Sequence, residues 1–489
     1  MSIKKNIAYN TILNISNIVF PAVTTPYISR VLGVTNVGIV NYSITFATYF
    51  VLFAALGIPK YGLREIAKYN NDENGRNKCF FEIFIINIFS TVFFSIIYIL
   101  LINTVPKLNT HRVFLAITGF LLFLGPLNTD WFFSGREKFK IIAIRSIMAK
   151  FLAIIALFVF VHTKQDAVRY LVLYVASTII SQIWNFIYLL KNEIKIKHQV
   201  LKLKKHLMPI VLLFASNVAI SIFTSLNTII LGFISEYSEV GYFTSADKIS
   251  RLILPFIISI SPVIVARINT LRGLDGNNGK QILSLLDYSF ELTIIFAVPA
   301  SIGLFAIAPR FVPMFFGKEF IPSIVPLQIL SLLIVIIGIS NLFGIQVLLA
   351  MGYDFNLFMS VALGAVTSLV LSFALIPKLG SIGASVSSIV SELVVALATI
   401  IYSIKLIDIK IHLSYFIKPL TASLPIIFIA YFMNLIIKNG IVFIGATIIL
   451  SVVLYLFVMI VIFKNRFLKE CEIGIIKNVS KHLWKNKNI

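Results

Sequence analysis

Long apolar segments alternate with short polar segments from one end of the chain to the other. Each apolar segment is close to the 20 residues or so that an α-helix needs to cross the hydrocarbon core of a membrane. About fourteen segments meet this criterion, so the pattern predicts an all-α polytopic membrane protein. Their approximate limits are residues 8–31, 38–59, 80–103, 113–135, 142–162, 168–190, 208–232, 241–266, 288–309, 323–349, 356–377, 381–404, 413–436 and 441–463.

The composition excludes a sizeable soluble domain. Of the 489 residues, 58% are hydrophobic and only 13% are charged, whereas soluble domains average about 25% charged residues. The net charge of +22 comes mostly from Lys and Arg in the segments between alternate spans, on the side that also holds Lys4 and Lys5. This asymmetry predicts that both termini are cytoplasmic. It also explains the charge without a nucleic-acid partner, and allows contacts with anionic membrane lipids.

Two features predict that the chain consists of two halves. The basic, amphipathic segment 191–207 separates the sixth and seventh spans. The pairs Leu32-Gly33 and Val37-Gly38 after the first span have a counterpart after the seventh, in Leu231-Gly232 and Val240-Gly241. Both sets fall in predicted outer turns. Repeats with the same direction across the membrane are typical of transporters whose site lies between the two halves.

Cations within or beside the spans are candidates for an anion site, because an ionisable group at membrane depth is costly unless it faces a cavity or a partner. Arg30 ends a helix that Pro21 and Pro26 bend, while Lys248 and Arg251 share a helix face. Together these three cations could bind a phosphate or pyrophosphate. The alternative is that Arg30 extends to a lipid headgroup and that Lys248 reaches the interface or pairs with an acid.

Three acids within the spans are candidates for cation coupling or for ion pairing: Asp130, Asp247 and Glu392. Asp130 could receive a proton or a sodium ion, or could pair with Arg145 or Arg136. Asp247 adjoins Lys248 in the sequence. Glu392 lies on a helix face of small residues that permits close packing, so a structural role as a buried hydrogen-bonding group is the favoured alternative.

No motif of a soluble enzyme is present in the sequence. It contains no phosphate-binding loop, no dinucleotide-binding glycine pattern, and no paired Cys or His at the spacing of metal ligands. The predicted outer loops are too short for a catalytic domain. We therefore expect a protein that is not an enzyme, with no cofactor or metal site.

Several segments resemble the Wzx-type polysaccharide flippases, which belong with the multidrug/cation antiporters and the lipid II flippases to one exporter superfamily. The segments that carry the resemblance are PYISRVLG, GIPKYGLREIA, DWFFSGREKFKIIAIRSIMAK, VGYFTSADKISRLILPF, LLAMGYDFN and GASVSSIVSEL. The resemblance implies two six-helix lobes with pseudo-two-fold symmetry around a central cavity, followed by two C-terminal helices. The implied boundaries are residues 1–200, 201–406 and 407–489.

For function, the resemblance implies translocation of undecaprenyl-pyrophosphate-linked oligosaccharide repeat units across the bacterial cytoplasmic membrane by alternating access. It implies that Arg30, Lys248 and Arg251 bind the pyrophosphate. It leaves the coupling ion open between a proton and a sodium ion. It also implies a polysaccharide polymerase and chain-length machinery as partners. The alternatives are a multidrug/cation antiporter of the same fold, which would need an acidic cavity, and a membrane polysaccharide polymerase. The pattern does not identify the sugars, or distinguish O-antigen from capsule.

Overall fold

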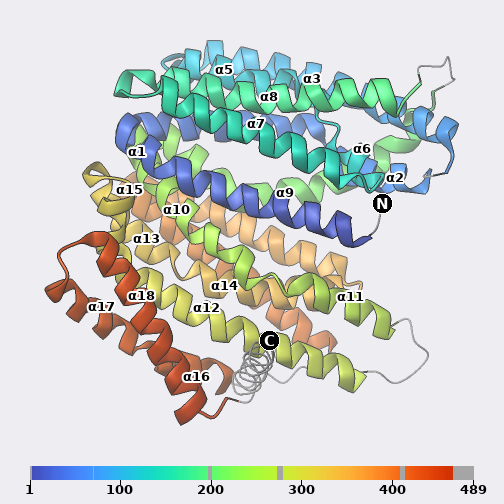
Figure 1. Cartoon of the computed structure of the whole chain (residues 1–489). Coiled ribbons are helices and arrows are strands. Elements are labelled where there is room, and N and C mark those ends of the chain that lie inside the picture. Colours follow the sequence, from blue (N-terminus) through green and yellow to red (C-terminus); the bar gives the residue numbers. More distant parts are fainter. Residues whose placement is uncertain (1–2, 70, 196–200, 273–278, 408–413, 466–489) are drawn as a thin grey trace, which may run out of the picture. The chain divides into compact units, whose positions relative to one another are not determined.

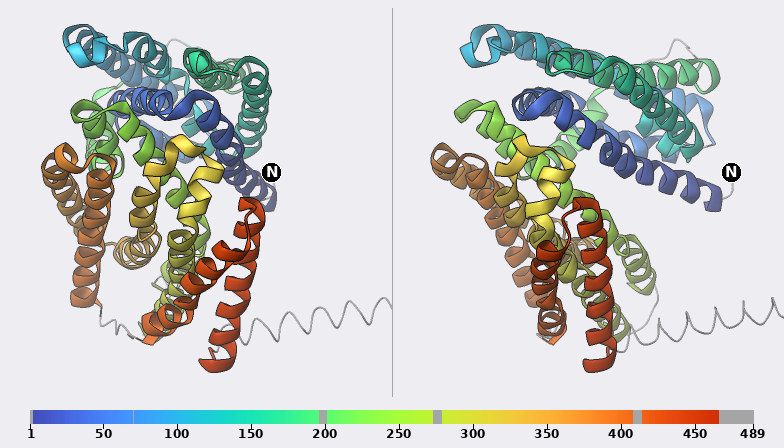
Figure 2. Two further views of the ribbon diagram at one scale, coloured as in Figure 1. Left: turned by 90° about the vertical axis from the view of Figure 1, so that its left-hand side faces the viewer. Right: turned by 60° about the vertical axis from the view of Figure 1, so that its left-hand side comes forward.

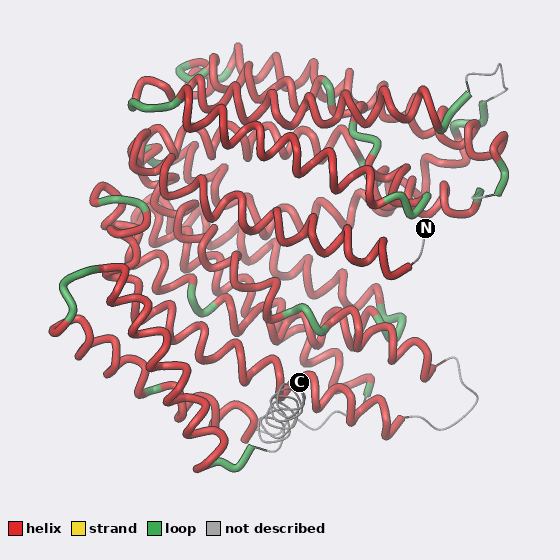
Figure 3. Tube along the Cα trace, in the orientation of Figure 1, coloured by secondary structure: helices red, strands yellow, loops and turns green. Residues whose placement is uncertain are grey.

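The computed structural model describes residues 3–465 apart from 70, 196–200, 273–278 and 408–413. Within this part of the chain the structure is helical and contains no strand (Figures 1 and 3). Contacts divide the chain into two compact units. The first comprises Met1–Ser245 and Ala365–Ser388, and the second comprises Ala246–Gly364 and Ile389–Ile489.

The first unit is built mainly from the N-terminal helices. Its elements are α1 (Ile3–Ala55), α2 (Ile58–Lys68), α3 (Glu73–Thr104), α4 (Pro106–Asn109), α5 (Arg112–Phe123), the 3₁₀ turn η1 (Gly125–Leu127), α6 (Asp130–Gly135), α7 (Phe139–Phe160), the 3₁₀ turn η2 (Lys164–Asp166), α8 (Ala167–Asn192) and α9 (Lys204–Ile234). The helix α10 (Tyr237–Ile257) begins in this unit and ends in the second. Within the first unit α7 packs along α8, as Figure 2 also shows.

The second unit contains the remaining helices. They are α11 (Ser261–Arg272), α12 (Gly279–Phe315), the 3₁₀ segment η3 (Lys318–Ser323), α13 (Ile324–Leu330), α14 (Leu333–Asn341), the π-helical segment η4 (Leu342–Leu349), α16 (Ser414–Ser423), α17 (Pro425–Ile436), α18 (Gly440–Phe457) and the π-helical segment η5 (Val458–Ile462). The long helix α15 (Asp354–Leu406) contributes its ends to this unit and residues 365–388 to the first.

The predicted all-helical membrane architecture is confirmed, but the number of spans is not. By length and composition, nine of the described helices could cross a membrane, or eleven if two bent pairs each count as one span. Two long helices each contain two predicted spans. The helix α1 is kinked at Gly33, where φ is 74°, and α15 is kinked at Gly380, where φ is 52°. Positive φ favours glycine because it has no Cβ.

Each unit has its own apolar core, while the outer faces of the helices remain apolar. In the first unit Phe80, Phe132 and Phe133 are fully buried, and in the second Phe343 and Val347 are. Large apolar side chains are exposed on many helices, including α3, α7, α17 and α18. Exposed apolar surface of this extent is expected where a protein faces lipid rather than water.

The contact-based units are not the predicted lobes. Residues Lys204–Ser245, which the repeat pattern places in the second lobe, pack with the first unit in this structure. The predicted lobe boundaries at residues 200 and 406 come from a repeat in the sequence, and the division by contacts does not test that repeat. They stay a prediction. The predicted amphipathic segment 191–207 lies partly outside the described residues.

Candidate functional site

Three of the predicted charged residues, Asp247 and Arg251 in α10 and Glu392 in α15, interact with one another in the second unit. The guanidinium Nε of Arg251 lies 2.8 Å and 2.9 Å from the two carboxylate oxygens of Asp247, one helical turn away. Arg251 also interacts electrostatically with Glu392. The Glu392 side chain is buried, and its Oε2 has no hydrogen-bond partner among the described residues. The arrangement is therefore one cation between two carboxylates, the second of which is incompletely satisfied.

The predicted pyrophosphate ligands occupy different surroundings. Lys248 is exposed, Arg251 is partly buried, and the two belong to the second unit. Arg30 is exposed on α1, shortly before the bend at Gly33, and belongs to the first unit. A shared site for all three cations therefore stays a prediction. A phosphate at Arg251 would have to share its guanidinium with Asp247.

Asp130 is paired with Arg145, which was one of the two alternatives for this acid. Arg145 Nη2 donates to Asp130 Oδ1 over 2.8 Å, and Asn185 Nδ2 donates to the same oxygen over 2.7 Å. The Arg145 side chain is only 6% exposed, so this ion pair has a buried cation. For Arg136, the other candidate partner, the guanidinium Nε instead lies 3.9 Å from Glu193 Oε2.

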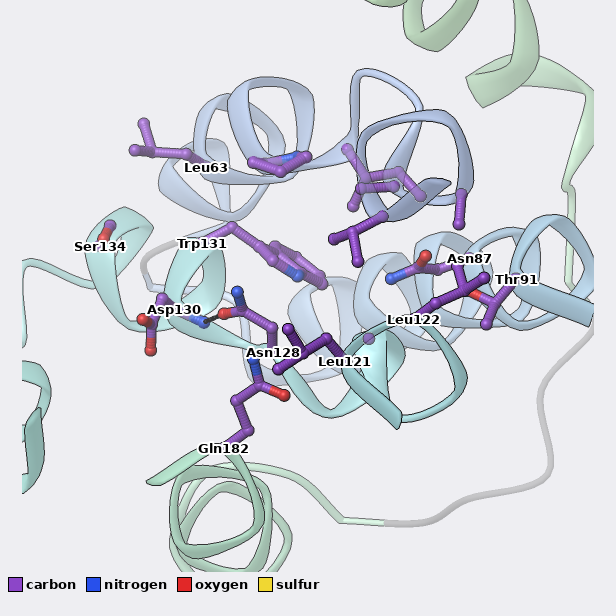
Figure 4. A pocket seen from close by; sticks show the side chains of 16 residues that line it. Leu63, Asn87, Thr91, Leu121, Leu122, Asn128, Asp130, Trp131, Ser134 and Gln182 are labelled. Carbon is purple, nitrogen blue, oxygen red and sulfur yellow. Dashed lines mark hydrogen bonds between the residues drawn. The ribbon is translucent and has the colours of Figure 1, made fainter. Parts of the chain in front are cut away.

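A cavity of about 270 Å³ lies beside Asp130 in the first unit. Figure 4 shows that the Asp130 carboxylate points away from Trp131, while the amides of Asn87, Asn128 and Gln182 surround the space beside that ring. The backbone N–H of Asp130 donates to Asn128 Oδ1 over 3.3 Å, so the turn before α6 helps to hold this wall in place.

The two helical hairpins that share the glycine pattern contact each other within the first unit. A Cβ added to Gly38 would lie 1.7 Å from the carbonyl oxygen of Tyr237, and one added to Gly241 would lie 2.4 Å from that of Val34. Glycine at these positions is what permits the close backbone approach. Asn41 Nδ2 donates to Thr244 Oγ1 over 2.8 Å across the same contact. The sequence repeat thus marks two segments that meet in this structure.

A lysine reinforces the end of the same contact. Lys107 Nζ in α4 donates to the carbonyl oxygens of Phe233 and Ser235, at 2.8 Å and 3.1 Å, and so caps the C-terminal end of α9. The His111 ring packs edge-on against Tyr237 with ring centroids 4.6 Å apart. Partial burial lowers the pKa of Lys107 and of His111.

Comparison with known proteins identifies the family. The family model described as "Polysaccharide biosynthesis protein" matches residues 3–268, more than half of the chain. The chain belongs to this family. It is 27% identical over 413 residues to a protein of Escherichia coli (strain K12) curated under the name "Putative O-antigen transporter", with 81% of this chain and 95% of that protein covered. A Shigella dysenteriae protein with the same name is 26% identical over 81% of this chain and 98% of its own length.

Two solved structures show the same fold. The lipid II flippase MurJ, in an inward closed conformation, matches with a TM-score of 0.78 and 15% identity, covering 94% of this chain and all of that one. A multidrug resistance MATE family transporter, in an inward-facing conformation, matches with a TM-score of 0.64 and 14% identity, covering 80% and 94%. The predicted resemblance to Wzx-type flippases is confirmed. The family member described here is a multi-pass membrane protein grouped with transporters, not with enzymes.

One buried charge network in this family member was missed from the sequence. Glu82 in α3 is fully buried and accepts hydrogen bonds from Lys205 Nζ, His206 Nε2 and the backbone N–H of Lys202, at 2.7–2.8 Å. Tyr61 OH lies 2.6 Å from His206 Nδ1. The signal was available, since Glu82 is an isolated acid in an apolar helix and the start of α9 is basic, with Lys205 and His206 in its first turn.

A second buried polar cluster was also not predicted. Asn227 in α9 donates to Ser388 Oγ over 2.7 Å and to the carbonyl oxygen of Ala384 over 3.3 Å, and it accepts from Ser372 and Ser368 in the preceding part of α15. The cluster is neutral. It ties α9 to both sides of the break at Gly380. Among the described residues no group of three or more His, Cys, Asp or Glu side chains could hold a metal ion.

Proposed function

We propose that this chain is a flippase that moves undecaprenyl-pyrophosphate-linked oligosaccharide repeat units across the bacterial cytoplasmic membrane for surface polysaccharide synthesis. The observation that carries the proposal is the match along 95% of the O-antigen transporter relative, together with the fold of a lipid II flippase. The names of those two proteins connect this architecture to O-antigen and to a lipid-linked glycan precursor.

The physical need for such a protein is clear. A saccharide head with a pyrophosphate loses its hydration in hydrocarbon, at a cost of several kcal/mol for each unsatisfied polar group. In the proposed mechanism, helices hold a polar path that opens to one side of the membrane at a time, while the lipid tail stays in the bilayer. In this mechanism we place the closure of one end of the path at the contact of the two hairpins, where Gly38 and Gly241 permit a close backbone approach.

We assign the pyrophosphate to Arg30, Lys248 and Arg251, as predicted from the sequence. The fork of a guanidinium matches two phosphate oxygens, so Arg251 would exchange its bond to Asp247 for one to the substrate. Alanine substitution of each cation tests the assignment. Arg251→Lys is the matched variant, because it keeps the charge and loses the fork. Full export by all three alanine variants would remove these residues as ligands.

For coupling we propose a proton and assign it to Glu392 rather than to Asp130. The Asp130 carboxylate already accepts from Arg145 and Asn185, whereas Glu392 is buried with one oxygen unpaired. A proton on the unpaired oxygen would remove the charge of this buried side chain and give it a hydrogen-bond donor. Glu392→Gln mimics the protonated form, so we expect export that no longer responds to a pH gradient. A pH response equal to that of the unaltered protein would contradict the assignment.

The experiment that tests the function is depletion of the protein in its host, followed by measurement of lipid-linked repeat units in each leaflet of the membrane. We expect accumulation on the cytoplasmic side and loss of surface glycan. Normal surface glycan without accumulation would overturn the proposal. The likeness to a multidrug transporter makes efflux of organic cations the second candidate, and restored resistance to such cations, with no effect on glycan, would favour it.

A further inference from the structure

The proposed function does not yet assign a role to the cavity beside Asp130. It lies within the first unit and is walled by α2, α3, α5, α6, α8 and the end of α1. Its volume of about 270 Å³ is just below the range for ligand pockets, which is roughly 300–1,000 Å³. It is therefore too small for a complete repeat unit and suited to one small ring.

Two polar atoms in its wall lack a hydrogen-bond partner among the described residues. Asn87 and Thr91, on consecutive turns of α3, are 6% and 4% exposed. Thr91 Oγ1 and Gln182 Oε1 form no hydrogen bond with the described residues, and the Asn87 side chain lines the same space. Buried polar atoms are almost always hydrogen-bonded in native proteins, so these groups call for a partner inside the cavity. Amides and a hydroxyl both donate and accept, and a ligand rich in hydroxyl groups does the same.

The cavity is electrically neutral toward its contents. Among the described residues of its wall, Asp130 is the only ionisable one. Its carboxylate accepts from Arg145 and Asn185 and points away from Trp131 (Figure 4). A charged ligand would lose its hydration here without a counter-charge, which is strongly unfavourable. The cavity therefore selects a neutral ligand.

The remaining wall is apolar, and Trp131 contributes a donor to it. The Trp131 ring stacks on Phe80, with centroids 5.7 Å apart, and packs against Gly62, so its indole N–H is the group that it can offer to a ligand. Ala54, Ala55 and Leu121 provide apolar surface on the side of α1 and α5. A sugar ring has this mixed character, with hydroxyl groups around its edge and apolar C–H groups on its faces.

We propose that this cavity binds a single neutral sugar ring, one residue of the saccharide that the protein transports. The inference rests on the proposed flippase function, because the sugar is taken to be part of the transported saccharide. It adds that the first unit recognises a neutral residue of that saccharide. Ordered water, which also satisfies buried polar groups, is the alternative occupant.

Tryptophan fluorescence of the full-length protein in detergent tests the proposal. Replacing Trp184 and Trp484 with Phe leaves Trp131 as the only tryptophan. Titration with glucose, galactose and N-acetylglucosamine should give a saturable change in emission for at least one sugar, with a Kd on the order of 1 mM. Glucuronate is the charged control and should give no saturable change. If no neutral sugar gives a saturable change, ordered water is the occupant of the cavity and the proposal is overturned.

Variants of α3 separate binding in the cavity from general effects. Asn87→Leu fills the polar side of the cavity and should weaken sugar binding at least tenfold. Thr91→Val, which is close to isosteric, should weaken it severalfold and serves if Asn87→Leu does not fold. Asn103→Leu, on an exposed position of the same helix, is the matched control and should leave binding unchanged. Equal binding by the Thr91→Val and unaltered proteins would contradict the proposal.

Translocation in vesicles keeps this proposal distinct from the proposed function. If the unaltered protein translocates lipid-linked repeat units and Asn87→Leu raises KM, both proposals are supported. If the unaltered protein translocates them and Asn87→Leu has no effect on rate or KM, the sugar site fails and the flippase function stands. If the unaltered protein does not translocate them, the flippase function fails, and the fluorescence titration still decides whether a sugar binds.

Discussion

At the scale of single residues, the charged side chains in the helices are constrained by their nearest partners. Arg145 is buried against Asp130, Arg251 is held by Asp247, and Glu82 is enclosed by Lys205 and His206. A buried ion needs such a partner because water is absent to solvate it. Glu392 interacts with Arg251, but its second oxygen has no hydrogen-bond partner among the described residues, and for this reason we assign it a proton.

The pair between Arg145 and Asp130 should contribute measurably to stability. We expect Arg145→Met to lower the free energy of unfolding by about 1–3 kcal/mol, less than the ~3–5 kcal/mol of a fully buried pair because the Asp130 side chain is 39% exposed. Thermal unfolding in detergent measures the effect. The double variant with Asp130→Asn should lose less than the sum of the two single losses. Lys68→Met, in the exposed pair with Glu65, is the control and should change nothing measurable.

His111 should make stability depend on pH. Burial lowers its pKa in the folded protein, so below the unfolded value of about 6.5 the unfolded state binds more protons. Stability should therefore fall as the pH drops below about 6.5, and the loss should stop once the pH is below the folded pKa. Unfolding measured between pH 7.5 and pH 5 checks this, with His111→Gln as comparison. An identical slope for the two proteins in this pH range would contradict it.

At the scale of helices, glycine determines where elements bend and where they approach. The bend of α1 at Gly33 and the break of α15 at Gly380 use positive φ. At the break, Glu239 Oε2 accepts from the backbone N–H of Ser381 over 2.6 Å and so caps the helix segment that follows. Gly38 and Gly241 instead permit close packing of two hairpins. These two uses of glycine have different consequences for substitution.

Gly38→Ala should destabilise the contact of the hairpins, because its methyl group would overlap the carbonyl oxygen of Tyr237. An overpacked contact costs about 1–3 kcal/mol, so the form in which the hairpins touch should become roughly 5- to 150-fold less populated. Export should fall while the protein still folds. Gly303→Ala in α12 is the matched control, because a Cβ there meets nothing within 4 Å. Normal export by Gly38→Ala would show that this contact is not needed for the cycle.

At the scale of the whole molecule, the proposed cycle requires the hairpin contact to open and close. Asn41 and Thr244 are joined by a side-chain hydrogen bond although they lie far apart in the sequence. Of the two cysteines in the chain, Cys79 is buried and Cys471 lies outside the described residues. A disulfide engineered between positions 41 and 244 can therefore test whether the hairpin contact must open.

A disulfide between Asn41→Cys and Thr244→Cys, in a background without Cys79 and Cys471, should lock the contact. We expect export to stop under oxidising conditions and to recover when a reductant is added, since alternating access needs both forms. Each single cysteine variant controls for the loss of the hydrogen bond. Undiminished export with the disulfide formed would exclude opening at this contact.

The sequence by itself determined that the protein is a helical membrane protein and which charged residues lie within its predicted spans. Hydropathy decides these properties, because apolar segments of about 20 residues and isolated charges within them are visible in one dimension. The quoted segments also identified the family. The glycine repeat was recognisable too, though not the fact that its two copies touch.

Only the tertiary structure decided which partner each polar group has. Arg145 with Asp130, Glu82 with the segment before α9, and Asn227 with four residues of α15 are contacts between separate helices. Hydropathy does not record how a helix is rotated or which neighbour it packs against. The cavity beside Trp131 was invisible for the same reason, since its wall joins segments from Val51 to Gln182 and no part of it forms a motif.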